Sequence, residues 1–543
     1  MQTAILFSVQ LVLSAMESCA SFLVYPRIFE SRADDDSLLL HIHEGLTLSL
    51  EKTSILAENI LITSSTDFDS DAIVLYGREL EKYLYHDTNH QAALAIKEMD
   101  GGLEVRGMLN PDLRIAPVVG SQRSDGATLH EVVKITERTD ASSEQWDNMT
   151  SIEESAEDED LSYSVQGDEM NIALVVNASS DYYADAIEYS PLSREDETSG
   201  TDETHTKRPK KHPMRFTVET CFVVDRKYES AFKDLYDLIL YISKMLNAVA
   251  LRFLDMTQPK VRFQLNKIIR NMSDIITNRT NNGTDVDAEA TLDTMKEYAR
   301  RGAFSHCDIA VYLTSEDLVL VGNNTIGRDV DGIAFIGGVC GDEKVGIVED
   351  RPPTYEGVGT LAHEIAHILG ANHDNTRTLK EFPGYPGAEN CSSKDGYLMS
   401  YAEGGRKNIR LSNCSKDQIR FIYRNLSRSC INVSREACYS SDSYPGQNMT
   451  RRQFCQLLHL GEVGAKPARK NATMHLRCQI ECCWKVAEIG LFCRYHSMAE
   501  GLKCAPGKTC RRGACAKHRW TRSRRSTEPT AKNLPVILPN KAV

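Results

Sequence analysis

The stretch HEIAHILGANHD, residues 363–374, places three histidines and one glutamate at fixed intervals. The residues before it carry apolar side chains with helical spacing, so His363 and His367 share one face of a predicted helix. Gly370 is predicted to end this helix, because glycine enters the left-handed conformation at little cost, and the reversed chain can then return His373. Three imidazoles leave one coordination position for water, which is typical of a catalytic zinc site.

The competing interpretation is a histidine-rich helix that binds no metal. Three His, one Glu and one Gly at these offsets would occur by chance with a probability of roughly 10⁻⁴ in a chain of this length. We therefore predict one catalytic Zn²⁺ ion, with Glu364 beside the ligands but about 100° away around the helix. Zinc would lower the pKa of a water and polarise a peptide carbonyl, and Glu364 would take the proton of that water.

The same stretch matches the long zinc motif of the metzincin endopeptidases. Asp374, directly after the third histidine, resembles the reprolysin (adamalysin) branch of that clan. YLMSY at 397–401 is similar to the clan's Met-turn, with Met399 beneath the zinc, although a lone methionine is more often ordinary core. The resemblance implies a zinc metalloendopeptidase with an α/β fold, in which a mixed sheet is combined with long helices.

Two further segments carry this resemblance. LSNCSKDQIRFIYRNLSRSCI, 411–431, is similar to the reprolysin C-terminal helix and closing cysteine. GIAFIGGVC, 332–340, resembles the edge strand that faces the substrate, whereas the plain alternative is a strand of the sheet core. The match covers residues 212–434, and the layout of the whole chain is most similar to the secreted reprolysins of tick saliva.

The remainder of the chain divides by composition. We predict a signal peptide over 1–20, a propeptide over 21–211 that includes an acidic linker at 140–206, a cysteine-rich disintegrin-like module at 435–520 with little regular structure, and a basic tail at 521–543. Residues 140–203 hold nineteen acidic residues and one arginine, in a chain whose net charge is −13. The basic cluster KRPKKHP at 207–213 is the predicted processing site, and a simple charged hinge is its alternative.

The chain is predicted to be secreted. After Cys19 no cysteine occurs until Cys221. Fifteen cysteines lie between Cys221 and Cys515, both included, which favours disulfide bonds in an exported protein. Twelve Asn-x-Ser/Thr sequons fit a glycoprotein. No later segment has the length of a membrane helix, and nucleic acid is a poor candidate partner for an exported protein. Because residues 21–220 contain no cysteine, a propeptide would have to maintain latency without a cysteine ligand to the zinc.

The reprolysin resemblance also implies disulfide bonds and a calcium site. It pairs Cys307 with Cys430 and Cys391 with Cys414, which leaves Cys221 and Cys340 as the remaining pair. The nine cysteines after residue 434 cannot all pair among themselves, so one would stay free or link to another chain. A Ca²⁺ ion near the closure of the chain would have Glu219 and Asn432 as ligands.

Extracellular proteins of the matrix or of clotting are the substrates that the resemblance implies. The alternative function is an adhesion-blocking or matrix-binding protein that acts through the C-terminal module, although no Arg-Gly-Asp sequence is present. Nine Lys/Arg and no acidic residue occur from 503 to 525. This segment is either a docking site for an anionic matrix surface or a solvated basic tail.

Overall fold

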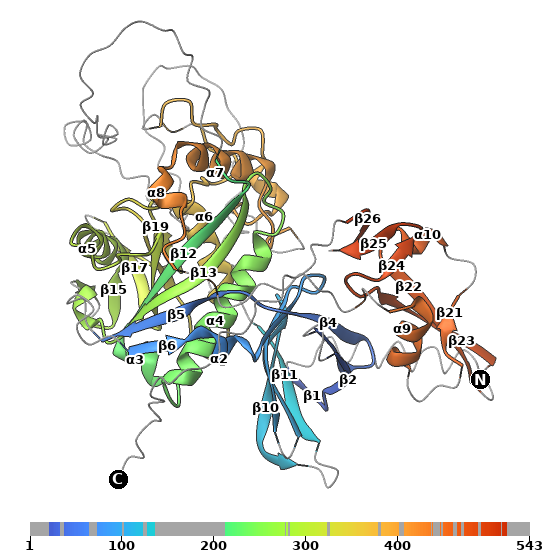
Figure 1. The fold of residues 1–543 in the computed structure, drawn as a ribbon. Coiled ribbons are helices and arrows are strands. Elements are labelled where there is room, and N and C mark those ends of the chain that lie inside the picture. Colours follow the sequence, from blue (N-terminus) through green and yellow to red (C-terminus); the bar gives the residue numbers. More distant parts are fainter. Residues whose placement is uncertain are drawn as a thin grey trace, which may run out of the picture. The chain divides into compact units, whose positions relative to one another are not determined.

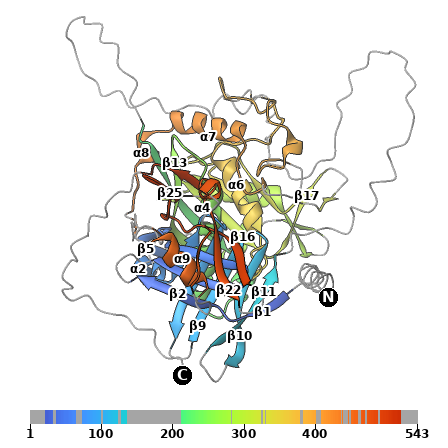
Figure 2. The ribbon, with the colours of Figure 1, turned by 90° about the vertical axis from the view of Figure 1, so that its right-hand side faces the viewer.

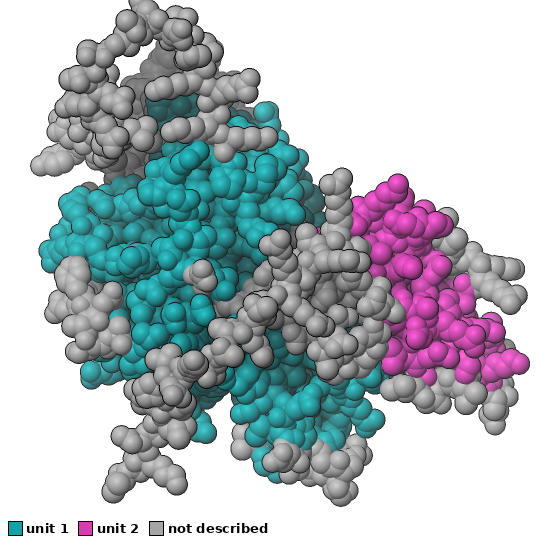
Figure 3. Space-filling model, in the orientation of Figure 1, with its two compact units in different colours: residues 1–30, 38–439 teal, residues 31–37, 440–543 magenta. Residues whose placement is uncertain are grey.

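The computed structural model describes most of residues 21–135, 212–437 and 446–518, with short gaps inside each range. The chain forms two compact units (Figure 3): residues 1–30 with 38–439, and residues 31–37 with 440–543. The predicted signal peptide, acidic linker and basic tail lie outside the described residues. Among the described helices, none is long and apolar enough to cross a membrane.

A seven-stranded mixed sheet forms the centre of the first unit (Figure 1), in the order β19-β20-β16-β12-β13-β5-β6. Neighbouring strands are parallel except at the two edges, where β19 and β6 run antiparallel to their neighbours. The mixed sheet predicted from the sequence is therefore present. Its strands are β5 (Leu56–Thr63), β6 (Ile73–Tyr76), β12 (Arg215–Val224), β13 (Lys260–Ile269), β16 (Ile309–Thr314), β19 (Gly332–Ala334) and β20 (Val345–Glu349).

Helices cover both faces of this sheet. Successive side chains of a strand point to opposite faces, so Phe222 and Val224 of β12 join the core with α4 and α6, whereas Cys221 and Val223 join the core with α5. Figure 1 and Figure 2 show α6 next to the sheet with α7 above it. The helices are α3 (Arg226–Ser230), α4 (Leu235–Arg252), α5 (Ala288–Arg300), α6 (Val358–Ile368), α7 (Asn413–Asn425) and α8 (Arg428–Ile431).

A small four-stranded sheet, in the order β14-β15-β17-β18, lies beside α5. Its strands are β14 (Arg279–Thr280), β15 (Asp285–Asp287), β17 (Asp317–Val321) and β18 (Ile326–Gly327), and short 3₁₀ helices span Ser273–Ile275 and Ser393–Asp395.

Two of the predicted disulfide pairings in this unit are wrong and one is confirmed. The structure pairs Cys221 with Cys307 and Cys340 with Cys430. The parallel register of β12 and β16 sets Cys221 opposite Ala310, so Cys307, three residues earlier, lies within reach of Cys221. Cys340 is then left for Cys430. The Cys391–Cys414 bond is present as predicted.

The N-terminal region forms a second, antiparallel sheet of nine strands, in the order β1-β11-β10-β9-β8-β7-β4-β3-β2. Alternate residues of β8 separate its two faces: Leu94 and Ile96 pack inside this region, whereas Ala93 and Ala95 join the core that contains α4. The strands are β1 (Ser21–Val24), β2 (Arg27–Arg32), β3 (Ser37–His43), β4 (Leu46–Lys52), β7 (Leu84–Asp87), β8 (Ala92–Met99), β9 (Gly102–Asn110), β10 (Leu113–Gln122) and β11 (Thr128–Lys134).

The strands β5 and β6 belong to the N-terminal region in sequence but to the central sheet in space (Figure 1). The N–H of Leu265 donates to the carbonyl of Ile55 at 2.8 Å, and the N–H of Arg270 donates to the carbonyl of Thr63 at 2.8 Å. The sequence predicts strand-like runs here, but it contains no signal that assigns them to the central sheet. The core of this unit therefore extends across the propeptide boundary predicted at residue 211.

Glu81, the last residue of α2 (Gly77–Glu81), holds the beginning of β5 in place. Its Oε1 accepts hydrogen bonds from the N–H groups of Ile55 and Leu56, both at 2.8 Å. Burial raises the pKa of this carboxyl to about 7. The pKa of Glu81 is higher in the folded state than in the unfolded state. The contribution of the protonated Glu81 to the free energy of unfolding is therefore fully present below the unfolded pKa, and it is lost as the pH rises through about 7.

We expect the free energy of unfolding of the wild type to be lower at pH 8 than at pH 5. The decrease should be on the order of 2–3 kcal/mol larger in the wild type than in Glu81→Gln. Glutamine keeps an acceptor oxygen but cannot titrate. Urea unfolding at both pH values measures the difference, and the exposed Glu79→Gln change in the same helix is the matched control. Equal pH dependence in wild type and Glu81→Gln would contradict the prediction.

The second unit is held together by disulfide bonds. Its eight cysteines form four bonds. Cys438, the ninth cysteine after residue 434, precedes this unit and lies outside the described residues. The unit contains more regular structure than predicted. Its two longest strands have eight residues each, but their sequences, QIECCWKV and GLFCRYHS, do not alternate strictly between apolar and polar residues. The elements are α9 (Arg451–Leu458), α10 (Ala472–His475), β21 (Lys466–Pro467), β22 (Gln479–Val486), β23 (Gly490–Ser497), β24 (Lys503–Ala505), β25 (Lys508–Arg511) and β26 (Ala514–Ala516).

Candidate zinc centre

The helix α6 ends where the sequence predicts, and its end determines where the third histidine lies. Gly370 has a φ of 108°, a backbone conformation that side chains with a Cβ rarely adopt. The N–H of Ala371 donates to the carbonyl of Ala366, and the N–H of Gly370 donates to that of His367, both at 2.8 Å. This is the paired hydrogen-bond pattern of a Schellman motif. It reverses the chain directly before His373.

The three histidines converge through their Nε2 atoms. These atoms lie 3.0 Å apart for His363 and His367, 3.0 Å for His363 and His373, and 3.2 Å for His367 and His373. The Nδ1 of His363 donates to the Leu398 carbonyl at 2.8 Å, and the Nδ1 of His367 donates to the Ala371 carbonyl at 2.7 Å. A carbonyl only accepts, so the proton is on Nδ1 and the Nε2 lone pairs face a common point.

The histidines are also in the protonation state that a metal requires. Burial lowers the pKa of His363 to about 4 and lowers the pKa values of His367 and His373 well below their ordinary value. Neutral imidazole is the ligand form, and three imidazoles are the donor set of a catalytic zinc site. Among the described residues, the ligand group at this point consists of these three histidines. The residues present therefore fit a zinc ion.

Glu364 lies on the same helix and is 4% exposed. Its Oε2 has no hydrogen-bond partner among the described residues. Burial, together with the nearby Asp331, raises the pKa of this carboxyl well above its ordinary value. A buried carboxylate without a partner is costly unless a cation neutralises it, so this group is a second feature that fits a metal site.

Gly332 of β19 provides the space for the Glu364 side chain. A methyl group added at Gly332 would lie 2.9 Å from Cγ of Glu364 and 2.6 Å from Cγ2 of Thr360. Gly332→Ala is therefore expected to displace Glu364 and to lower kcat/KM for peptide cleavage by about tenfold to a hundredfold. The zinc content should stay unchanged, because no ligand moves. Peptide kinetics beside metal analysis test this, and an unchanged kcat/KM would argue against it.

Asp374 connects the third histidine to two other parts of the site. Its carboxylate accepts hydrogen bonds from the hydroxyls of Ser400 at 2.9 Å and Ser412 at 2.6 Å, and its N–H donates to the carbonyl of Met399 at 2.8 Å. Met399 is fully buried. Sequence reasoning missed both serines; the only available signal was the helix-capping role of Ser412 before α7.

The residues predicted to bind calcium have other surroundings. The carboxylate of Glu219 accepts hydrogen bonds from the side chains of Asn266 and Ser434 and from the backbone N–H groups of Ser434 and Arg435, at 2.6 to 3.0 Å. Asn432 follows α8 and is exposed. The calcium site therefore stays a prediction.

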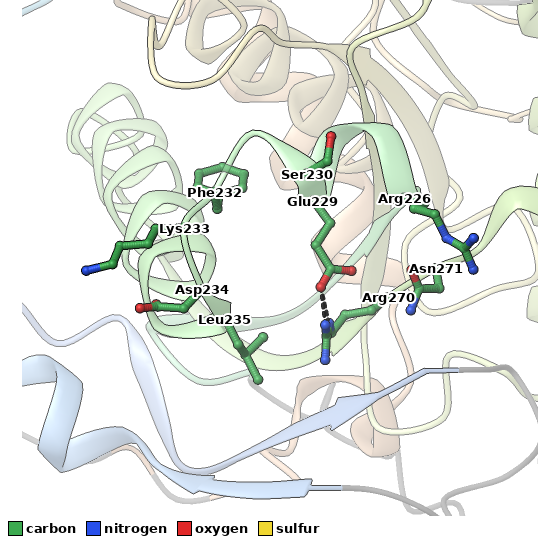
Figure 4. A pocket seen from close by; sticks show the side chains of 9 residues that line it. All are labelled: Arg226, Glu229, Ser230, Phe232, Lys233, Asp234, Leu235, Arg270 and Asn271. Atoms are coloured by element: carbon green, nitrogen blue, oxygen red, sulfur yellow. Dashed lines mark hydrogen bonds and ion pairs between the residues drawn. The ribbon is translucent and has the colours of Figure 1, made fainter. Parts of the chain in front are cut away.

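A separate hollow, with a volume of about 460 Å³, lies where α3 ends and α4 begins (Figure 4). Most of the residues that line it are polar or charged, and the Nε of Arg270 donates to the carboxylate of Glu229 there at 2.9 Å. None of the three histidines lines it. The hollow is therefore distinct from the zinc centre.

Comparison with known proteins agrees with this geometry. The family model described as metallo-peptidase family M12, of the reprolysin type, matches residues 215–412. The chain is 26% identical over 452 residues to "A disintegrin and metalloproteinase with thrombospondin motifs like" of Bombyx mori, covering 80% of this chain and 64% of that protein. It is 25% identical over 421 residues to venom metalloproteinase BumaMPs1 of Olivierus martensii, covering 75% of this chain and 91% of that protein.

A third relative matches a shorter part of the chain. Snake venom metalloproteinase fibrolase of Macrovipera lebetinus is 26% identical over 218 residues, which cover 39% of this chain and 95% of the relative. The matches thus agree on a metalloproteinase domain in this chain. Residues 215–412 therefore form a reprolysin-type metallopeptidase domain of family M12.

Proposed function

We propose that this protein is a secreted, zinc-dependent metalloendopeptidase that hydrolyses peptide bonds of extracellular proteins. The observation that carries the proposal is the convergence of three neutral imidazoles beside the buried carboxylate of Glu364, whose Oε2 has no hydrogen-bond partner in the described part of the chain. The similarity to proteins named as venom metalloproteinases and as a disintegrin and metalloproteinase supports the proposal.

His363, His367 and His373 would hold the zinc. When bound, zinc makes a water more acidic and polarises the carbonyl of the bond to be cut. Glu364 accepts the proton of the attacking water and then delivers it to the leaving amine. The carbonyls of Leu398 and Ala371 keep two of the imidazoles oriented during this sequence.

The strand β19 would position the substrate. It is the edge of the central sheet and has a neighbouring strand only on the β20 side within the described residues. Its first residue, Gly332, lies against Glu364. An extended substrate could therefore add to this edge by backbone hydrogen bonds and pass the catalytic glutamate. Strand pairing needs no free chain end, which favours an endopeptidase.

Residues 21–211 would act as a propeptide. No cysteine is available there to bind the zinc, but this region contributes β5 and β6 to the central sheet and packs β8 against α4. After cleavage near the basic cluster at 207–213, the strand pairing and the packing against α4 would keep residues 21–211 bound to the rest of the chain. N-terminal sequencing of the secreted protein tests the maturation site.

Matrix or clotting proteins are the proposed substrates. The alternative, in which the C-terminal module carries the function, has less support because the family match ends at residue 412. The basic surface at 503–525 stays a prediction, and residues 519–525 lie outside the described part of the chain.

Digestion of unfolded fibrinogen and fibronectin, followed by mass spectrometry of the new termini, tests the proposal. We expect cuts in the interior of these chains, which disappear in a parallel sample treated with a zinc chelator. Release of terminal residues alone, or cutting that continues in the chelated sample, would overturn it.

A further inference from the structure

The C-terminal unit contains a pair of histidines that the proposed activity does not use. Its β22–β23 hairpin pairs Ile480 with His496 and Trp484 with Phe492. The disulfide Cys455–Cys482 attaches α9 to this hairpin. Because side chains alternate along a strand, Cys482 and Trp484 share the face of β22 that meets α9. His496 lies on the same face of β23, opposite Ile480.

The other histidine, His459, directly follows the last turn of α9. Its ring contacts the indole of Trp484, with centroids 3.9 Å apart and the two planes tilted by 32°. Its Nε2 lies 3.0 Å from the Nε2 of His496. Both histidines are partly exposed, so an ion in solution can reach them. The disulfide Cys455–Cys482 and the contact of His459 with Trp484 restrict the position of the pair.

The pair repeats the spacing of the zinc centre in the same molecule. There the Nε2 atoms are 3.0 to 3.2 Å apart and the ring centroids 4.6 to 5.1 Å apart. In the pair the centroids are 5.0 Å apart. We propose that His459 and His496 form a second binding site for a divalent transition metal, for which Zn²⁺ is the probe.

The remaining ligands of this second site would be water molecules. The Sγ of Cys482 lies within 4.8 Å of both ligand nitrogens, but it belongs to a disulfide and is not a thiolate. Two protein ligands bind a metal more weakly than three converging ones, so a moderate chelator should empty this site before the catalytic site. A metal here would link the end of α9 to β23.

Zinc bound by the full chain, after equilibrium dialysis against Zn²⁺ alone and elemental analysis, tests the proposal. We expect two zinc ions per wild-type chain and one in His459→Ala or in His496→Ala, with peptide cleavage preserved in both variants. His518→Ala, a histidine of the same unit outside the pair, should keep two. The proposal is contradicted if the wild-type chain binds only one zinc ion, or if His459→Ala and His496→Ala both still bind two. Either result would show that His459 and His496 are only hydrogen-bonded to each other.

A second measurement leaves the C-terminal unit intact. In a His363→Ala/His367→Ala chain, which lacks two catalytic ligands, one zinc ion should remain and should be lost again when His496→Ala is added. If the His363→Ala/His367→Ala chain binds no zinc, the proposal of a second site is wrong. This arm does not depend on activity, so failure of the proposed peptidase function and failure of the second site are distinguishable.

Discussion

Replacing Glu364 by Gln is expected to lower kcat for peptide cleavage by about 10²- to 10⁴-fold, the range that general acid–base groups contribute. The change keeps the shape of the side chain and removes its ability to take a proton. The imidazoles of His363 and His367 should stay in place, because the carbonyls of Leu398 and Ala371 orient them. The zinc content should therefore equal that of the wild type.

A matched control separates this effect from a general loss of glutamate charge. Glu356, which lies shortly before α6, is paired with Arg351 and does not belong to the group around the histidines. Glu356→Gln should keep kcat within about twofold. Peptide kinetics, elemental analysis and circular dichroism of the three proteins complete the test. A Glu364→Gln enzyme with nearly wild-type kcat would remove Glu364 from the mechanism.

Replacing Gly370 by Ala is expected to cost about 2–6 kcal/mol of stability. The residue has a φ of 108°, where an L side chain is strained by about 1–3 kcal/mol. Its new methyl group would also lie 2.3 Å from Cγ1 of Ile422, and such overpacking costs a further 1–3 kcal/mol or so. Movement of the turn would displace His373, so zinc binding should weaken as well.

Gly359→Ala is the control, because it lies in the same helix and has no other atom within 4 Å of the added methyl group. It should stabilise the helix by about 0.5–1 kcal/mol. Urea unfolding and zinc analysis of both variants measure the contrast. Equal stability of the two variants would mean that the turn after α6 tolerates a side chain, contrary to this account.

The convergence of the three histidines could be predicted from the sequence because its geometry is local. Two histidines four residues apart on a helix, followed by a glycine, determine where the third histidine can return. The mixed sheet and the Cys391–Cys414 bond were also predictable. The contacts of Asp374 with Ser400 and Ser412 were not, because they join residues up to 38 positions apart.

The errors have a common physical origin in long-range pairing. The disulfide partners of Cys221 and Cys340 depend on the register of β12 against β16, which no residue pattern encodes. The pairing of β5 with β13 joins the N-terminal region to the central sheet, and it is likewise a contact between residues far apart in the sequence. A strand-like run predicts a strand, but it does not predict the neighbour of that strand.

The most direct test of the central claim is removal and return of zinc. The purified chain is stripped with a chelator, dialysed and titrated with Zn²⁺ while the initial rate of peptide cleavage is followed. The account predicts that cleavage disappears on stripping, returns with the first equivalent of zinc, and does not return in His373→Ala. Cleavage that persists in the zinc-free chain, or that His373→Ala recovers equally, would contradict it.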